Sequence, residues 1–179
     1  MHQLAVLVFV CKRIDGINSK LVIYGRKPFQ HYPKDYLHCD TMSPFRIINK
    51  IYNFSTEGEV QFVDLTEKVQ EFVSDSGISN GIVHVFAPHA TGIIVLTEND
   101  SALLEDIRVF LELIASKNKR YHHPSNAHSH LRSVLLPPDR TLPIINGKVE
   151  LGTWQSLLFI ETDVYPRRRS VIVQILGES

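Results

Sequence analysis

The sequence has little cysteine and no long hydrophobic run. Its two cysteines, Cys11 and Cys39, both lie within the first 40 of 179 residues. They do not form a Cys-x-x-Cys pair, and their position excludes a disulfide framework for the whole chain. The apolar run at 4–11 is far too short to cross a bilayer, and neither a basic segment nor a small-residue cleavage site accompanies it. We therefore expect a reduced, cytoplasmic protein without a membrane partner.

An excess of charge of either sign is also missing. The 19 Lys and Arg residues balance the 19 Asp and Glu residues, so the formal net charge is zero. A nucleic-acid partner usually shows itself as a basic excess, and we predict none here. Apolar residues make up 44% of the chain, which is typical of a globular protein. The length allows one domain with a substantial core plus an appendage.

Residues 1–41 differ in pattern from the rest of the chain. Two short apolar segments, 4–10 and 21–24, flank an Asp-Gly turn signal and precede a connector that contains two prolines. This region is either an N-terminal extension or a hairpin appended to the main sheet. Synthesis that begins at Met42 is a further possibility. Residues 42–179 are expected to form the main domain.

Hydrophobic periodicity after Met42 predicts an α+β protein, a mostly antiparallel β-sandwich with two or three helices. Strands are predicted at 45–55, 59–64, 82–87, 91–96, 141–145, 148–151, 156–162 and 170–176. Helices are predicted from Thr66 to Gly77, after an N-cap at Asp100, and at 127–135. We expect strand 59–64 to be the hairpin partner of 45–55, and Asn146-Gly147 to close a second hairpin. The order of elements lacks the alternation of a doubly wound parallel sheet.

Histidine is concentrated in one segment. Four of the nine histidines lie between residues 121 and 136: His122, His123, His128 and His130. Neutral imidazole binds borderline metals well. His89 follows a buried strand, which is a rigid mount, and His89, His123 and His130 could converge from two loops. Three imidazoles with an open fourth position are typical of a catalytic zinc site. The alternative is a chance cluster of surface histidines before a helix.

Two carboxylates and one amide could support such a site. Glu98 follows the strand after His89, and Glu161 lies late in another strand. Either could accept a histidine N–H or act as a general base, and the alternative for each is a solvated carboxylate at the rim. Asn126 shares a helix face with His130 at a spacing of i, i+4. Our predicted catalytic set is Glu98, Glu161 and Asn126.

The residues predicted to bind substrate or cofactor lie near the C-terminus. Three arginines occupy 167–169, directly before the last strand, and alternation would turn one or two of them inward. A guanidinium there suits a bidentate phosphate contact, whereas the alternative is a solvated basic turn. Gln155, next to Trp154, is part of either ordinary packing or a stacking wall. We predict that Arg167, Arg168 and Gln155 bind substrate.

Taken in order, these motifs resemble the YjbQ-like family, known as secondary thiamine-phosphate synthases. The resemblance covers about residues 44–177. The matching segments are 81–92 (GIVHVFAPHATG), Glu98, the helix around Asp106, Tyr121 with His123, Asn126 with His130-Leu131, Asn146-Gly147, 151–155 (LGTWQ), Glu161 and 167–169. The Leu-Gly-Thr-Trp-Gln and Asn-x-x-x-His-Leu blocks are specific when they occur in this order.

The resemblance implies an α+β sandwich that forms a homotrimer, with its site at or near the subunit boundaries. It implies that His89, His123 and His130 bind a divalent metal, zinc in preference to magnesium. It also implies a transferase that joins hydroxymethylpyrimidine diphosphate to thiazole phosphate and releases diphosphate, an activity that is often weak in the family. Two alternatives stay open: a metal-assisted hydrolase of a small phosphorylated metabolite, and a non-catalytic trimeric binding protein.

Three positions depart from the family pattern. Thr97 stands where the family usually has Asn, Ala90 replaces the first Thr after the histidine, and His128 stands where an acid is common. The loop between His123 and Asn126 also lacks the Glu-Asp pair of the family. These changes affect the surroundings of the expected metal ligands more than the ligands themselves. They are the observation that favours the non-catalytic alternative.

Overall fold

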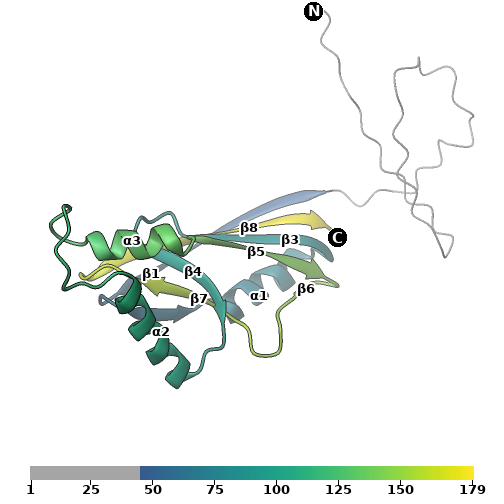
Figure 1. Ribbon diagram of the computed structural model, residues 1–179. Coiled ribbons are helices and arrows are strands. Elements are labelled where there is room, and N and C mark those ends of the chain that lie inside the picture. Colours follow the sequence, from purple (N-terminus) through teal and green to yellow (C-terminus); the bar gives the residue numbers. More distant parts are fainter. Residues whose placement is uncertain (1–44) are drawn as a thin grey trace, which may run out of the picture. The chain divides into compact units, whose positions relative to one another are not determined.

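The computed structural model describes residues 45–179, which form two antiparallel sheets and three helices (Figure 1). The elements are β1 (Arg46–Thr56), β2 (Gln61–Asp64), α1 (Thr66–Ser76), β3 (Asn80–Phe86), β4 (Gly92–Thr97), α2 (Ser101–Ile114), α3 (Ala127–Leu135), β5 (Asp139–Ile145), β6 (Lys148–Val149), β7 (Ser156–Glu161) and β8 (Arg167–Glu178). The predicted α+β class is confirmed. Our expectations for residues 1–41 and for a start at Met42 lie outside the described residues.

The strands form one sheet of five and one of three. The larger has the order β1-β8-β3-β5-β6, and the smaller has the order β2-β7-β4. The expected hairpin between β1 and β2 is wrong, because β1 pairs with β8 along its length while β2 pairs with β7 in the other sheet. Local alternation identifies a strand, but the choice of partner depends on which apolar faces must be buried together.

The main core lies between the two sheets and is closed by α1. Alternate residues of β8 point into it, including Val171, Val173 and Ile175, all fully buried. Phe159 of β7 contributes from the facing sheet, and Phe72 contributes from α1. The opposite face of β8 is half-buried and of mixed polarity, with Ile172, Gln174 and Leu176 among its residues.

A second, smaller core lies on the other face of the three-stranded sheet, under α2. Leu111 of α2 packs there against Ile93 of β4 and Ile160 of β7, and all three side chains are buried. The three-stranded sheet is therefore apolar on both faces. Figure 1 shows α2 and α3 together on the left of the view, with α1 to the right near β6. Among residues 45–179, no helix is long and apolar enough to cross a membrane.

Several local predictions are confirmed at the ends of the helices and at one turn. The Asp100 carboxylate caps α2 by accepting the backbone N–H groups of Ala102 and Leu103. Gly77 ends α1 in the left-handed region, with φ of 68°. Asn146 and Gly147 have φ of 51° and 75°, and they join β5 to β6 as a hairpin.

Candidate functional site

Most of the predicted site residues gather at one end of the three-stranded sheet, which we call the histidine end. Strands β4 and β7 are antiparallel, and their register places Gly92 opposite Glu161. His89 lies in the loop that enters β4, and its backbone carbonyl accepts a hydrogen bond from Gly92. Asn126 begins α3 and contacts the β7–β8 loop, so the residues that follow it along the chain approach the same end.

Glu98 and Gln155 lie at the opposite end of the same sheet. Thr97, the last residue of β4, pairs with Ser156, the first residue of β7. Glu98 follows one of these residues and Gln155 precedes the other, so both are exposed beyond the ends of their strands. The length of β4 separates them from the histidine end by about 17 Å, at about 3.4 Å per residue. Within one chain they cannot serve the site that the histidines form.

The histidine end contains a connected set of side chains that we call the buried polar cluster. Its members come from five different segments and are joined by hydrogen bonds: Thr56, Thr91, Asn126, Glu161, Asp163 and Arg169. Five of the six are buried, and Asn126 is half-buried. Burial of so many polar groups is tolerated because they satisfy one another. The cluster ties β1 and β8 of the large sheet to β7 of the small one.

Glu161 and Arg169 form the centre of the buried polar cluster. The two side chains make a two-pronged pair, with Arg169 Nε 2.6 Å from Oε2 and Nη2 2.5 Å from Oε1 of Glu161. The remaining acceptor capacity of the carboxylate takes the Thr56 hydroxyl at 2.7 Å and the Asp163 N–H at 2.8 Å. A fully buried carboxylate with four donors has no access to a substrate. Glu161 therefore has a structural role, in place of the general-base role that we predicted.

Asn126 and Asp163 fix which nitrogen of His123 is protonated. An ionised carboxylate can only accept hydrogen bonds, so the Asn126 amide nitrogen must face Asp163 Oδ1, at 3.4 Å. The amide oxygen then faces His123 Nε2 at 3.1 Å, and that nitrogen must donate. The lone pair of the neutral ring is consequently left on Nδ1. Asn126 thus orients a histidine, as partners of metal-binding histidines do.

His123 and His130 lie in contact with each other. Their ring centroids are 5.4 Å apart, and the ring planes are inclined at 88°. Two imidazoles that share one tetrahedral zinc have centroids about 5 Å apart, given Zn–N bonds of about 2.0–2.1 Å. The observed spacing also suits an edge-to-face aromatic contact. The pair that the sequence predicted is brought together, at a separation that fits two ligands of one ion.

His89 is held against β8. Its Nε2 lies 2.9 Å from both the backbone nitrogen and the backbone oxygen of Ser170. Nε2 either donates to the carbonyl oxygen, which leaves Nδ1 free to bind a metal, or accepts the Ser170 N–H, which places the proton on Nδ1. Burial lowers the pKa of His89 below its ordinary value of 6.5, Arg169 acts in the same direction, and the Ser170 carbonyl and Glu161 oppose them. The neutral ring, which is the ligand form, is favoured.

The three histidines do not meet within a single chain. Among residues 45–179, no three His, Cys, Asp or Glu side chains are close enough to hold one metal ion. The predicted triad of His89, His123 and His130 is therefore only partly assembled here, as the His123–His130 pair. The physical reason is that His89 projects from the β3–β4 loop onto β8, whereas the other two project from the loop before α3 and from α3 itself.

The arginines of β8 alternate as expected, but two of the three already have partners. Arg167 donates to Asp163 Oδ2 at 2.9 Å and lies beside the Tyr165 ring. Arg169 is buried on Glu161. Arg168 is exposed on the opposite face of the strand. A phosphate contact by Arg167 would have to compete with Asp163, so Arg168 is the less committed of the two predicted arginines.

A second buried ionic group lies beneath α3 and includes His128. Arg132 is 1% exposed, and its guanidinium contacts the carboxylates of Glu59 and Glu112 together with the backbone carbonyls of Leu111 and Ala115. His128 Nε2 lies 3.4 Å from Glu59. His128 therefore faces away from the His123–His130 pair, as its helical position predicts.

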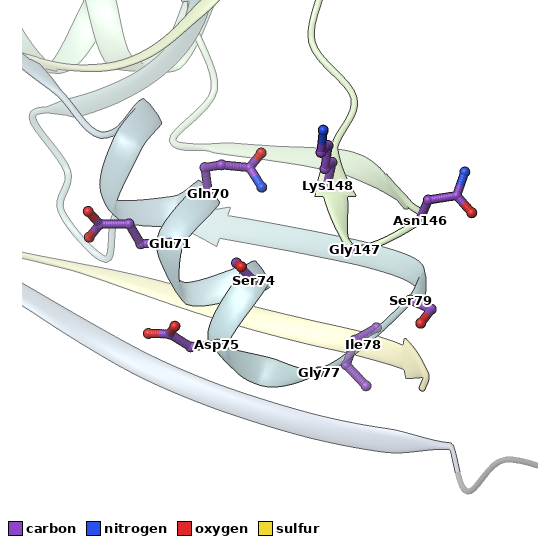
Figure 2. Close-up of a pocket in the computed structure, with 10 residues that line it drawn as sticks. All are labelled: Gln70, Glu71, Ser74, Asp75, Gly77, Ile78, Ser79, Asn146, Gly147 and Lys148. Atoms are coloured by element: carbon purple, nitrogen blue, oxygen red, sulfur yellow. The ribbon is translucent and has the colours of Figure 1, made fainter.

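The structure contains two notable surface hollows, and they differ in what lines them. The larger, of about 740 Å³, lies between the C-terminal half of α1 and the β5–β6 turn (Figure 2). Its lining includes Glu71, Asp75 and Lys148, and no residue that we predicted for the site. The smaller, of about 270 Å³, is lined by His123 and by the loop that precedes it. Of the predicted site residues, His123 is the one that lines the smaller hollow.

Sequence reasoning missed Asp163 and Thr91, both members of the buried polar cluster. Asp163 follows Glu161 by two residues, and a spacing of two at a strand end places both side chains on one face. This spacing could have predicted that Asp163 lies beside Glu161. Thr91 carried no signal, because its role depends on Arg169 and Asp163, which approach it only in the folded chain.

Asp163 gives the stability of the protein a specific dependence on pH. Burial would raise the pKa of Asp163, but Arg167, the Asn126 amide and the Val164 N–H together hold it below its ordinary value of 3.8. The stabilisation from Asp163 is therefore present above the pKa of the unfolded chain and is lost as the pH falls through the folded value. We expect Asp163→Asn to be less stable than wild type at neutral pH, with a difference that narrows below about pH 4. Urea unfolding at a series of pH values measures this, and a constant difference would contradict it.

The protein is an α+β sandwich of two packed sheets. A helix covers the outer face of the smaller sheet, and a histidine pair lies at one end of that sheet. The chain belongs to the UPF0047 protein YjbQ-like family, whose model matches residues 50–178. The resemblance seen in the sequence is thereby confirmed.

Relatives and solved structures agree with this assignment. A UPF0047 protein from Methanothermobacter thermautotrophicus is 44% identical over 126 residues, 69% of this chain and 87% of that protein. The crystal structure of a YbjQ-like protein from Sulfolobus solfataricus has a TM-score of 0.73 and 33% identity, and covers 75% of this chain and all of that one. A structure of a yjbq/upf0047 family protein from Clostridium acetobutylicum has a TM-score of 0.67 and 38% identity, over 70% of this chain and 98% of that one.

Proposed function

We propose that the protein is a metal-dependent enzyme with secondary thiamine-phosphate synthase activity, which joins hydroxymethylpyrimidine diphosphate to thiazole phosphate and releases diphosphate. The observation that carries the proposal is the contact between His123 and His130 at the edge of a hollow. Membership of the family supports it through the resemblance described above. A substrate with two phosphorylated parts also suits a hollow that opens to solvent beside possible metal ligands.

The metal of this proposal is zinc, held by His123 through Nδ1 and by His130. Two imidazoles supply half of a tetrahedral set. His89 is the third candidate, since burial favours its neutral ring, the form that binds a metal. Because one chain does not bring three ligands together, we propose that the set is completed at a subunit boundary of a homotrimer. When bound, the ion would neutralise charge that develops on the departing diphosphate.

The residues of this chain have distinct parts in the proposed reaction. Asn126 holds the His123 ring so that one nitrogen faces outward, and Asp163 holds Asn126. Glu161 and Arg169 keep the surrounding strands together. Arg168 is free to contact a phosphate. A trimer would also explain the position of Glu98 and Gln155, because a residue too distant within one subunit can reach the site of the next.

The test measures zinc content and turnover in the full-length protein. We expect His130→Ala, and equally His89→Ala, to bind zinc at least about tenfold more weakly than wild type, because each removes a ligand. His84→Ala is the matched control, since it removes an imidazole from the outer face of the five-stranded sheet, where His84 is bonded to Thr141. Wild-type zinc content in both ligand variants would overturn the proposal.

The products of turnover separate the proposed reaction from its alternatives. Diphosphate release that requires both organic substrates supports the synthase. Turnover of a single phosphorylated substrate would identify a hydrolase instead. Zinc binding without any turnover would identify a non-catalytic binding protein.

A further inference from the structure

The loop between α2 and His123 carries three cationic side chains within four residues: Lys117, Lys119 and Arg120. All three are exposed, and all three line the hollow of about 270 Å³ that His123 also lines. The rest of its lining is polar or small and includes Tyr121 and Ser125. Among the described residues, no Asp or Glu lines this hollow.

The charges of this loop are not consumed by neighbouring acids. None of the ion pairs formed within residues 45–179 uses these three side chains. Glu112 accepts the backbone N–H of Lys117 and is attracted by its charge, but the Glu112 carboxylate is bound by Arg132 at 2.8 Å. Lys119 lies over the Tyr121 ring, with its Nζ 5.9 Å from the centroid. Lys119 and Arg120 are therefore the cations with the most freedom to bind a ligand.

The loop cations differ from two of the arginines of β8, which already have acidic partners. There the guanidinium groups of Arg167 and Arg169 are engaged by Asp163 and Glu161. Binding a phosphate at those arginines would require an existing ion pair to break, whereas binding at the loop requires only the displacement of water. The first turn of α3 also lines the hollow through Ala127 and His128, and no side chain caps it. Its N–H groups add to the positive potential.

We propose that Lys119 and Arg120, with Lys117, form the subsite that receives the diphosphate group of the substrate. The inference rests on the proposed function and assigns its main anion-binding residues to this loop, with Arg168 as the one arginine of residues 167–169 that no acid engages. The size agrees, because pockets that enclose a whole drug-sized ligand have about 300–1,000 Å³, and this hollow would hold only the charged end. His123 lines the same hollow, so a group bound there lies beside the proposed metal ligands.

The experiment measures the binding of inorganic diphosphate to the full-length protein by titration calorimetry. We expect the double variant K119Q/R120Q to bind diphosphate at least about tenfold more weakly than wild type, since one charge-assisted hydrogen bond is worth about a decade in affinity. Both side chains are exposed, so the variant should fold normally. Lys148→Gln, which removes one charge from the other hollow, is the control and should bind as wild type does.

Four outcomes are informative. Weakened binding in K119Q/R120Q with unchanged zinc content supports the subsite. Equal affinity in wild type and K119Q/R120Q would overturn it, as would a wild-type protein that does not bind diphosphate at millimolar concentration. Either negative result would leave the zinc measurement untouched, so failure of the subsite can be told apart from failure of the metal site. If Arg168→Gln bound diphosphate more weakly and K119Q/R120Q did not, the subsite would lie at β8 and the proposal would be wrong.

Discussion

Replacement of Glu161 by Gln is expected to lower the free energy of unfolding by about 3–5 kcal/mol, because it leaves the buried Arg169 guanidinium without a counter-charge. Arg169 is only 8% exposed, so water can replace little of the lost counter-charge. A loss of this size is a large part of the total stability of a typical domain, about 5–15 kcal/mol. Urea unfolding followed by circular dichroism measures it, since the single tryptophan, Trp154, is exposed and a poor reporter of the core.

The control for this prediction removes both partners. In the double variant Glu161→Leu with Arg169→Met no buried charge remains, and its loss should be smaller than the sum of the two single losses by at least about 1 kcal/mol. Additive losses would show that the two side chains contribute independently. They would contradict the central place of this pair in the buried polar cluster.

Arg132→Met is expected to cost a similar amount, about 3–5 kcal/mol, because a nearly buried Glu59 would lose its main partner. The same change removes two hydrogen bonds to the carbonyls of Leu111 and Ala115 near the end of α2. Since α3 carries Asn126 and His130, loosening of this helix should also weaken zinc binding. Chemical unfolding and zinc titration of one preparation measure both effects.

Arg168→Met is the matched control for Arg132→Met. It makes the same substitution at an exposed position of β8, where the expected change is within about 0.5 kcal/mol. If Arg132→Met were as stable as this control, the ionic group beneath α3 would have no part in holding the helix.

The features that the sequence predicted well are those decided by neighbours along the chain. Asp100 caps α2 because its side chain reaches N–H groups two and three residues later. Gly77 ends α1, and Asn146-Gly147 closes a hairpin, because each conformation has positive φ, which these residues adopt at little cost. Such choices need no knowledge of the rest of the fold.

The pairing of strands could not be read in the same way. Segments 46–56 and 61–64 are adjacent and both alternate, so a hairpin was the simplest prediction. Their true partners lie about 100 residues away in the sequence, because burial of two sheet faces outweighs proximity. Strand register cannot be read from the sequence either, so Glu98 and Glu161 were predicted to share one site. The antiparallel pairing of β4 with β7 puts them at opposite ends of a sheet.

The candidate site shows a similar division. His123 and His130 could be predicted to meet because a short loop and one helical turn separate them, and the structure places their rings in contact. The distance of His89 from that pair depends on how separate loops pack against one another. No local sequence pattern specifies that packing. The basic residues between Lys117 and Arg120 were not among the predicted site residues, because no motif in the sequence links them to the histidines.

The buried polar cluster joins the two sheets where their edges come closest to the histidines. Elsewhere the sheets are held by side chains that can slide past one another, but at this end relative movement would break an ion pair and several directed bonds together. We therefore expect the backbone amides at this end of the sheets to exchange only with global unfolding. Asn126, and through it His123, is attached to this stiff joint by Asp163, so the spacing of the imidazoles is set before any ligand arrives.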